Sequence, residues 1–271
     1  MIYNLKLIAA NTIFALLLVF VMSACKRTES SLGFNDDMSG DNSRAEFVSD
    51  DAENIGNAAM MGQSGFRVED NFIGQCASVF NDTINNIVTI DFGTVNCVGA
   101  DGRTRRGKII INYTGHYFET GSIKNFSFQD FYVNDNHVEG TRVVTNEGLN
   151  AAGHFHWTIV SGITITKTDG IVLTWNRTGE REMLAGQGTD SVWDDQYSIT
   201  GIAIGTRNGN NYSAEITSPL IRSMSCHYIN SGVILIIPAS HAPVTIDFGN
   251  GTCDAQATVT SNGHSHTVTL H

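Results

Sequence analysis

The sequence has little proline and few basic residues. Only 3 of its 271 residues are proline, and its 16 lysines and arginines are outnumbered by 27 aspartates and glutamates, which gives a formal net charge of −11 at pH 7. An acidic chain is not expected to bind nucleic acid, because phosphates attract cationic surfaces. With 41% hydrophobic residues, the chain is neither collagen-like nor disordered. The composition predicts a folded globular protein that does not bind nucleic acid.

The sequence also lacks the short signatures of common catalytic and metal sites. It contains no Cys-x-x-Cys spacing, no His-Glu-x-x-His helix and no Gly-x-Ser-x-Gly nucleophile elbow, so we expect no cofactor and no bound metal. Acidic residues at Glu180–Glu182 and Asp194–Asp195 could in principle form the carboxylate pair of a glycoside hydrolase. The sequence favours a protein that is not an enzyme, with a carbohydrate-active hydrolase of the envelope as the alternative.

The first 25 residues have the features of a bacterial lipoprotein signal. Lys6 supplies a positive charge, residues 13–22 are apolar, and the small residues Ser23 and Ala24 precede Cys25. The apolar run is too short for a comfortable membrane span, and small residues at its end are typical of a cleavage site. We therefore expect removal of residues 1–24 and lipid attachment to Cys25, with an ordinary secretory peptide as the alternative. Nothing after Cys25 is long and apolar enough to span a membrane.

Residues 25–70 are acidic and rich in Ser, Gly and Asn. This composition predicts a flexible tether over residues 25–44. A short helix and a linker are expected over residues 45–70. The helix would lie between Ala45 and Met61, because Ser49 can cap it and the two acids that follow Ser49 suit a helix N-terminus.

Residues 71–271 have a β pattern almost throughout. Val, Ile, Thr, Phe and Tyr recur in short runs separated by turn dipeptides such as Asn208-Gly209. Short connections predict mainly antiparallel pairing. The run Val233–Ile237 does not alternate, which indicates burial on both faces. The sequence predicts an all-β domain, built as a mainly antiparallel sandwich or a curved, partly closed barrel.

Four cysteines remain once Cys25 is assigned to lipid. An even number of cysteines in an oxidising compartment predicts disulfides. Three pairings are formally possible, and the order along the chain favours Cys76–Cys97 and Cys226–Cys253, each stabilising by about 3 kcal/mol in the chain-entropy account. Four buried free thiols are the alternative.

The sequence Val-Thr-Ile-Asp-Phe-Gly occurs twice, at Val88–Gly93 and Val244–Gly249, and the match continues without a gap through Gly107 and Gly263. In each copy we expect the phenylalanine to be buried, the glycine to adopt a positive φ and the aspartate to accept backbone N–H bonds of a turn. The motif residues are Asp91, Phe92, Gly93, Asp247, Phe248 and Gly249. The repeat predicts a duplicated architecture.

Three further features have both a structural and a functional interpretation. The pairs His154/His156 and His264/His266 could bind a metal if two strands brought them together, but structural roles are favoured. The basic segment Gly102–Lys108 predicts a hairpin tip that could meet a sulfated or carboxylated partner. Three tryptophans at intervals of eighteen favour core packing over a sugar-stacking platform; they are Trp157, Trp175 and Trp193.

The residues before Cys25, the stretch Ile90–Lys108 and the segment Asp194–Gly201 together resemble secreted lipoproteins of Bacteroidota, relatives that have no assigned activity. The resemblance implies a cell-envelope location, at the periplasmic face or the surface of the outer membrane, and adds no catalytic residue. We therefore expect a lipid-anchored envelope lipoprotein whose β body binds or scaffolds. Its expected partners are the membrane, through the lipid anchor, and a glycan or protein of the envelope.

Overall fold

The computed structural model describes residues 29–63, 73, 75–99, 101–189 and 191–270. The chain divides into two compact units, residues 1–34 and 35–271, and all the strands belong to the second. The signal segment and Cys25 lie outside the described residues. No helix in the described ranges is both long and apolar enough to cross a membrane.

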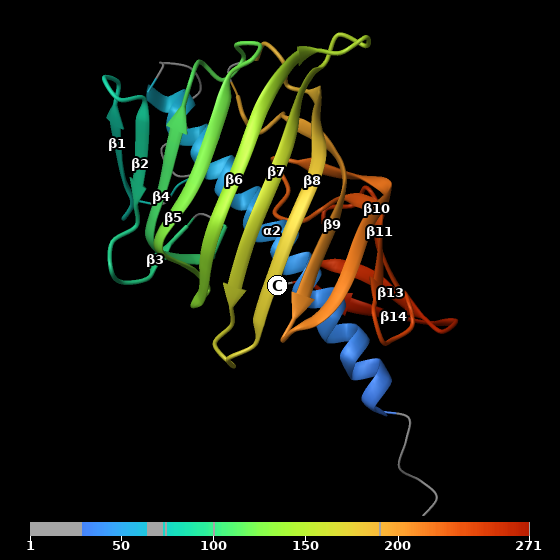
Figure 1. Cartoon of the computed structure of the whole chain (residues 1–271). Helices are drawn as coiled ribbons and strands as arrows, with labels where there is room; N and C mark the ends of the chain where they lie inside the picture. The colour runs from blue at the N-terminus through green and yellow to red at the C-terminus, as the bar shows by residue number, and fades with distance from the viewer. Residues whose placement is uncertain (1–28, 64–72, 74, 100, 190, 271) are drawn as a thin grey trace, which may run out of the picture. The chain divides into compact units, whose positions relative to one another are not determined.

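The second unit contains a β-sheet of 14 strands and most of one long helix (Figure 1). The helix is α2 (Glu29–Gln63). The strands are β1 (Ser78–Asp82), β2 (Ile87–Asp91), β3 (Cys97–Val98), β4 (Thr104–Tyr113), β5 (Ile123–Val133), β6 (Asn136–Leu149), β7 (Phe155–Thr166), β8 (Val172–Ala185), β9 (Gln196–Arg207), β10 (Asn210–Ser223), β11 (Ser231–Pro238), β12 (Val244–Asn250), β13 (Gln256–Ser261) and β14 (His264–Thr269).

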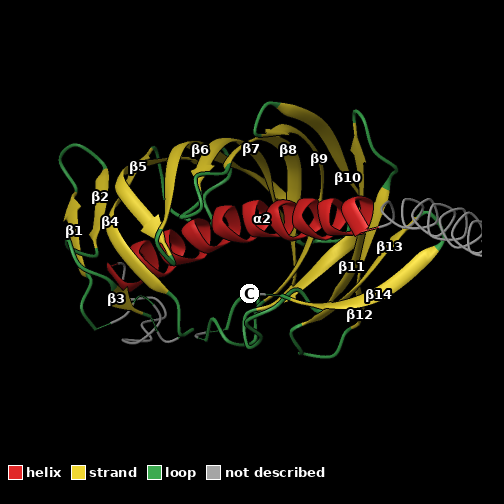
Figure 2. Ribbon diagram, turned by 90° about the horizontal axis from the view of Figure 1, so that it is seen from below, coloured by secondary structure: helices red, strands yellow, loops and turns green. Residues whose placement is uncertain are grey.

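The strands follow one another across the sheet in chain order, each antiparallel to the last, except that β3 pairs with β4 beside the main path. The predicted mainly antiparallel all-β fold is confirmed. The sheet curls but does not close into a barrel (Figure 2). The run Val233–Ile237 was expected to be buried on both faces, and this is wrong: Ile234 and Ile236 are buried, whereas Ile237 is 48% exposed.

Bulges help the sheet to curl. Seven of the strand pairings contain a register shift, and an extra residue on one strand bends it and increases its twist. Gly107, at the shift between β4 and β5, has φ +84°, and a Cβ there would lie 1.9 Å from the carbonyl oxygen of Asp130. Only glycine fits this position.

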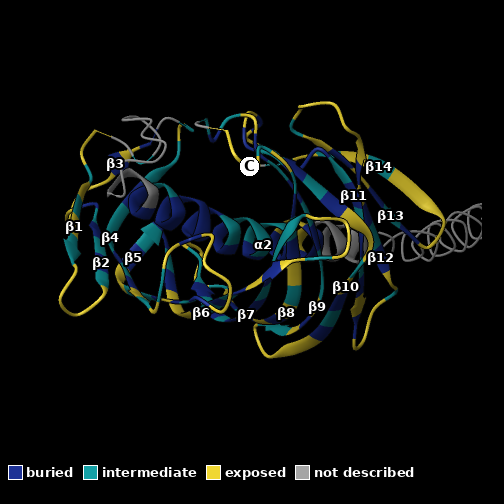
Figure 3. Cartoon of the chain, turned by 90° about the horizontal axis from the view of Figure 1, so that it is seen from above, coloured by how far each residue is buried: buried dark blue, intermediate teal, exposed yellow. Residues whose placement is uncertain are grey.

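The part of helix α2 that belongs to the second unit, residues 35–63, lies lengthwise in the hollow of the curled sheet (Figure 2). A stripe of small residues faces the sheet and allows close packing: Ala45, Ser49, Ala52, Gly56 and Ala59. A Cβ on Gly56 would lie 2.5 Å from Phe126 Cε1 and 2.6 Å from Ile111 Cδ1. Much of the helix is buried, as its dark blue colour in Figure 3 shows.

The predicted flexible tether is wrong for residues 29–44, because α2 already includes them, and the helix is 35 residues long rather than confined to Ala45–Met61. The expected linker after Met61 falls largely outside the described residues. Helices in proteins gain most of their stability from tertiary packing. Several of the acidic residues that suggested a solvated tether instead contact the sheet, as Asp41 contacts Arg207.

Candidate functional site

A band of ion pairs joins α2 to the hollow of the sheet, and we call it the helix–sheet seam. Its acids come from α2: Asp37, Asp41, Glu46, Asp50, Asp51 and Glu53. Its cations come from the β unit: Arg103, Arg105, Lys124, Arg142, Lys167, Arg177, Arg181, Arg207 and Arg222. These are nine of the eleven lysines and arginines after residue 72. Most of the lysines and arginines after residue 72 therefore face helix α2.

Two groups of seam contacts have well-formed geometry. Near the C-terminal half of α2, Arg105 donates two hydrogen bonds to Asp51, with Nε to Oδ2 at 2.9 Å and Nη2 to Oδ1 at 2.7 Å. Towards the N-terminal half, Arg207 Nε lies 2.8 Å from Asp41 Oδ2, and Lys167 Nζ lies 3.0 Å from Asp41 Oδ1. Bidentate arginine–carboxylate pairs add geometric specificity as well as energy. The seam therefore specifies the rotation of α2 about its axis and its position along the hollow.

The most deeply buried part of the seam is a cluster around Glu53, its last acid along α2. This carboxylate is 1% exposed, accepts a hydrogen bond from Arg142 Nη2 and lies 3.2 Å from Arg181 Nη1. Burial alone would raise the pKa of Glu53, but the charges of Arg142, Arg181 and Lys124 outweigh it and lower the pKa to about 2. Glu53 is therefore ionised at every physiological pH.

Lys124 is the least usual member of this cluster. Its Nζ donates to Asn57 Oδ1 at 2.7 Å and lies 4.2 Å from the ring centroid of Tyr117. Burial lowers the pKa of Lys124 to about 7; the charge of Glu53 raises it, and Arg181 and Arg142 lower it again. The ammonium group therefore loses its proton much more readily than an exposed lysine does.

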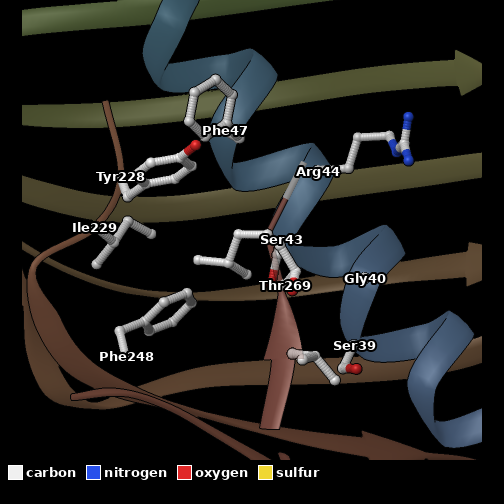
Figure 4. Close-up of a pocket in the computed structure, with 11 residues that line it drawn as sticks. Ser39, Gly40, Ser43, Arg44, Phe47, Tyr228, Ile229, Phe248 and Thr269 are labelled. Carbon is white, nitrogen blue, oxygen red and sulfur yellow. The ribbon is translucent and has the colours of Figure 1, made fainter. Parts of the chain in front are cut away.

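A separate cavity of about 150 Å³ lies beside the N-terminal half of α2 (Figure 4). Its walls come from the helix, from the loop after β10, from β12 and from the end of the chain. The lining residues are Ser39, Gly40, Ser43, Arg44, Phe47, Tyr228, Ile229, Phe248, Val268, Thr269 and Leu270. Figure 4 shows Phe248 and Ile229 opposite Ser39 and Ser43, while the Arg44 guanidinium extends away. The cavity is mainly apolar, with serine hydroxyls on one side.

Both predicted disulfides are present, Cys76–Cys97 and Cys226–Cys253, so the interpretation as free thiols is wrong. The second disulfide ties the loop that carries Tyr228 and Ile229 to the segment just after β12. It therefore helps to hold one wall of the cavity next to Phe248.

The two copies of the repeated motif form the same local turn. Asp91 Oδ1 accepts the Gly93 N–H at 2.8 Å, and Asp247 Oδ1 accepts the Gly249 N–H at 2.8 Å. Both glycines have positive φ, 78° and 90°. The two phenylalanines are buried, as predicted: Phe92 and Phe248.

The gapless duplication does not extend beyond this turn and the cysteines. Asp91 pairs with Lys108 on β4, whereas Asp247 pairs with Thr258 on β13, because the first copy contains the extra strand β3 before its partner strand begins. Gly107 consequently lies within β4, while Gly263 lies in the turn between β13 and β14. The prediction of equivalent places throughout both copies is wrong in this part.

The basic segment Gly102–Lys108 is not a free hairpin tip, since β4 begins within it. All four cations contact carboxylates of the same chain. Arg103 and Arg105 contact Asp101 and Asp51, Arg106 contacts Asp135, and Lys108 Nζ lies 3.1 Å from Asp91. An external anionic partner would have to displace these contacts.

The histidine pairs lie on or beside strands far apart in the sheet, β7 and β14. His154 Nδ1 lies 2.7 Å from Glu182 Oε1, and His156 Nδ1 lies 3.1 Å from the Gly148 carbonyl oxygen. Within the described ranges, no group of three or more His, Cys, Asp or Glu residues could hold a metal ion. The structure does not bring the four imidazoles together.

The candidate acids of a hydrolase do not converge on one point. Glu180 and Glu182 alternate with the inward-facing Arg181, so they lie on the outer face of β8, where Glu182 bonds His154. Asp195 is buried and accepts a hydrogen bond from the Tyr197 hydroxyl at 3.0 Å. Of the tryptophans, Trp157 and Trp175 are fully buried in the core, and Trp193 lies between β8 and β9.

The helix–sheet seam was not predicted from the sequence. A signal for it was present, because Arg177 and Arg181 lie an even number of residues from Trp175 along one strand. They therefore point to the same face of the sheet as this large apolar side chain. Their partners are remote in sequence; Asp41 and Arg207 are 166 residues apart. The alternation along a strand indicates that an arginine points inward, but it does not identify the carboxylate that pairs with it.

No protein-family model, no curated protein and no solved structure matches this chain.

Proposed function

We propose that this chain is a lipid-anchored lipoprotein of the bacterial cell envelope, whose β body binds or scaffolds partners close to the membrane. The lipoprotein signal and Cys25 support the anchor. The observation that carries the proposal beyond the sequence is the helix–sheet seam, because it ties the segment that follows the anchor into the body.

The seam limits how far the body can move from its anchor. Asp37, the first seam acid, is 12 residues after Cys25, and α2 already includes residues 29–37, so this stretch reaches less than the about 40 Å of a fully extended chain of that length. The expected flexible segment of residues 25–44 would have reached about 70 Å when extended. A body held this close to the bilayer suits a binding or scaffolding role at the membrane surface.

The described acids support this non-catalytic role over the hydrolase alternative. A glycoside hydrolase needs two carboxyl groups on either side of one glycosidic bond. Glu182 is engaged by His154 and Asp195 by Tyr197, on different faces of the sheet. The ionisable groups of the seam are likewise engaged with one another.

Metabolic labelling with an alkyne fatty acid, followed by membrane fractionation, tests the anchor. Wild type should be labelled and sediment with membranes, whereas Cys25→Ala should be unlabelled. Cys76→Ala is the matched control, because it removes a cysteine that pairs with Cys97 and should leave the label in place. Equal labelling of wild type and Cys25→Ala would refute the proposal.

A further inference from the structure

The two copies of the repeated motif differ in what surrounds their phenylalanine. In the first copy, Phe92 packs against Phe131, with ring centroids 5.9 Å apart, and Phe131 in turn stacks on Phe128 at 5.3 Å. In the second copy, Phe248 lines the cavity of about 150 Å³. The same turn therefore has an aromatic neighbour in one copy and open space in the other.

The apolar side chains around an opening of this size gain contacts when something fills it. Protein interiors are close-packed, and atoms that line a void lose their dispersion contacts. An apolar cavity of about 150 Å³ can stay free of water and bind a molecule the size of benzene. Phe47, Ile229, Phe248 and Leu270 supply apolar walls of the kind that such a ring contacts.

One polar atom of the lining has no partner. Ser43 Oγ is buried and makes no hydrogen bond with any described residue. A helical serine commonly bonds the carbonyl oxygen one turn earlier, and Ser43 does not. Because a buried hydroxyl without a partner destabilises the fold, it suits a hydrogen bond to a ligand.

We propose that this cavity binds a small ligand made of one aromatic ring and one hydrogen-bonding group, as in phenols. The ring lies against Phe248, Ile229 and Leu270. The polar group bonds Ser43 Oγ. The site is independent of the lipid anchor, and its occupancy is measured separately from membrane attachment.

Titration of the purified full chain with phenol and with toluene, followed by saturation-transfer NMR, tests the site. If the chain sediments with membranes it is studied in nanodiscs, and empty nanodiscs give the background. Both probes should bind saturably at one site. Ser43→Ala should weaken phenol binding about 2- to 10-fold, the range of one hydrogen bond, and change toluene binding less than about twofold.

Ser43→Leu should abolish binding of both probes, because the larger side chain fills the cavity. Ser218→Leu, an exposed position on β10, is the matched control and should leave both affinities unchanged. If Ser43→Leu does not fold, the Ser43→Ala comparison still decides the matter. Failure of both probes to bind in the millimolar range, unchanged binding in Ser43→Leu, or unchanged phenol affinity in Ser43→Ala would overturn the assignment.

Discussion

Replacing Glu53 with glutamine tests whether the helix–sheet seam holds the fold together. The substitution keeps the volume of the side chain, so it leaves no cavity. It removes the negative charge that Arg142, Arg181 and Lys124 share, while Asp50 stays 3.6 Å from Arg181. Removing one partner of a buried ion pair typically costs about 3–5 kcal/mol, because the other charge stays buried without compensation. We expect a loss in that range from a total stability that is typically about 5–15 kcal/mol.

Urea unfolding followed by tryptophan fluorescence measures the loss, since Trp157 and Trp175 are fully buried and report on the core. Glu180→Gln is the matched control: this glutamate is exposed on the outer face of β8, and the change should stay within about 0.5 kcal/mol. A loss below about 1 kcal/mol for Glu53→Gln would show that the seam contributes little to stability and does not hold the fold together.

The same substitution should also alter the pH dependence of stability. The pKa of Glu53 is lowered from 4.5 to about 2, so its ionised form contributes stability that is complete above about pH 4.5 and is lost as the pH falls towards 2. Wild type should lose this part of its stability in acid, and Glu53→Gln should not. The difference between the two proteins should therefore shrink between about pH 5 and pH 3, and a constant difference would contradict the assignment.

Lys124, the second disulfide and two glycines of α2 each give a further prediction. Because the pKa of Lys124 is lowered to about 7, the unfolded chain binds more protons above that pH, so wild-type stability should rise between about pH 7 and 9. Lys124→Met should lack this rise. Urea unfolding at several pH values measures it, and parallel curves of stability against pH for the two proteins would contradict the lowered pKa of Lys124. Cys226→Ser combined with Cys253→Ser opens a loop with a sequence separation of 27 and should lower the free energy of unfolding by about 3–4 kcal/mol. Thermal and urea unfolding measure this loss, and a double variant as stable as wild type would show that the disulfide does not stabilise the fold by loop closure. Gly40→Ala should stabilise α2 by about 0.5–1 kcal/mol, because the new Cβ meets no atom within 4 Å. Gly56→Ala should destabilise the protein by about 1–3 kcal/mol, because its Cβ would clash with the sheet. Calorimetry measures both changes, and effects of the same sign would contradict the close packing of Gly56.

Local signals were sufficient for the β unit and its disulfides. Strand alternation and turn dipeptides depend on neighbouring residues, so the all-β antiparallel fold was predictable. The order of the cysteines and the repeated motif indicated Cys76–Cys97 and Cys226–Cys253, which the structure confirms. The burial of Phe92 and Phe248 followed from the strand period of two.

The candidate cavity was not predictable, because its walls come from four separate parts of the chain. Phe248 was recognised as a core residue, but the space beside it depends on where α2 and Leu270 lie. The motif also looks identical in both copies, and only packing distinguishes Phe92, which contacts Phe131, from Phe248.

The sequence by itself determined that the chain is acidic and indicated an all-β domain over residues 71–271, and it favoured the cysteine pairs that form, since each of these depends on composition or on short-range pattern. Tertiary structure alone decided the fate of the acids in residues 37–53. With no partners in view, the acids up to residue 44 indicate a solvated tether and the later ones a short helix. The sheet places arginines against both groups, as Arg207 against Asp41 and Arg142 against Glu53. A charged residue has no fixed structural meaning until its counter-charge is placed, and here the counter-charges come from about 50 to 170 residues further along the chain.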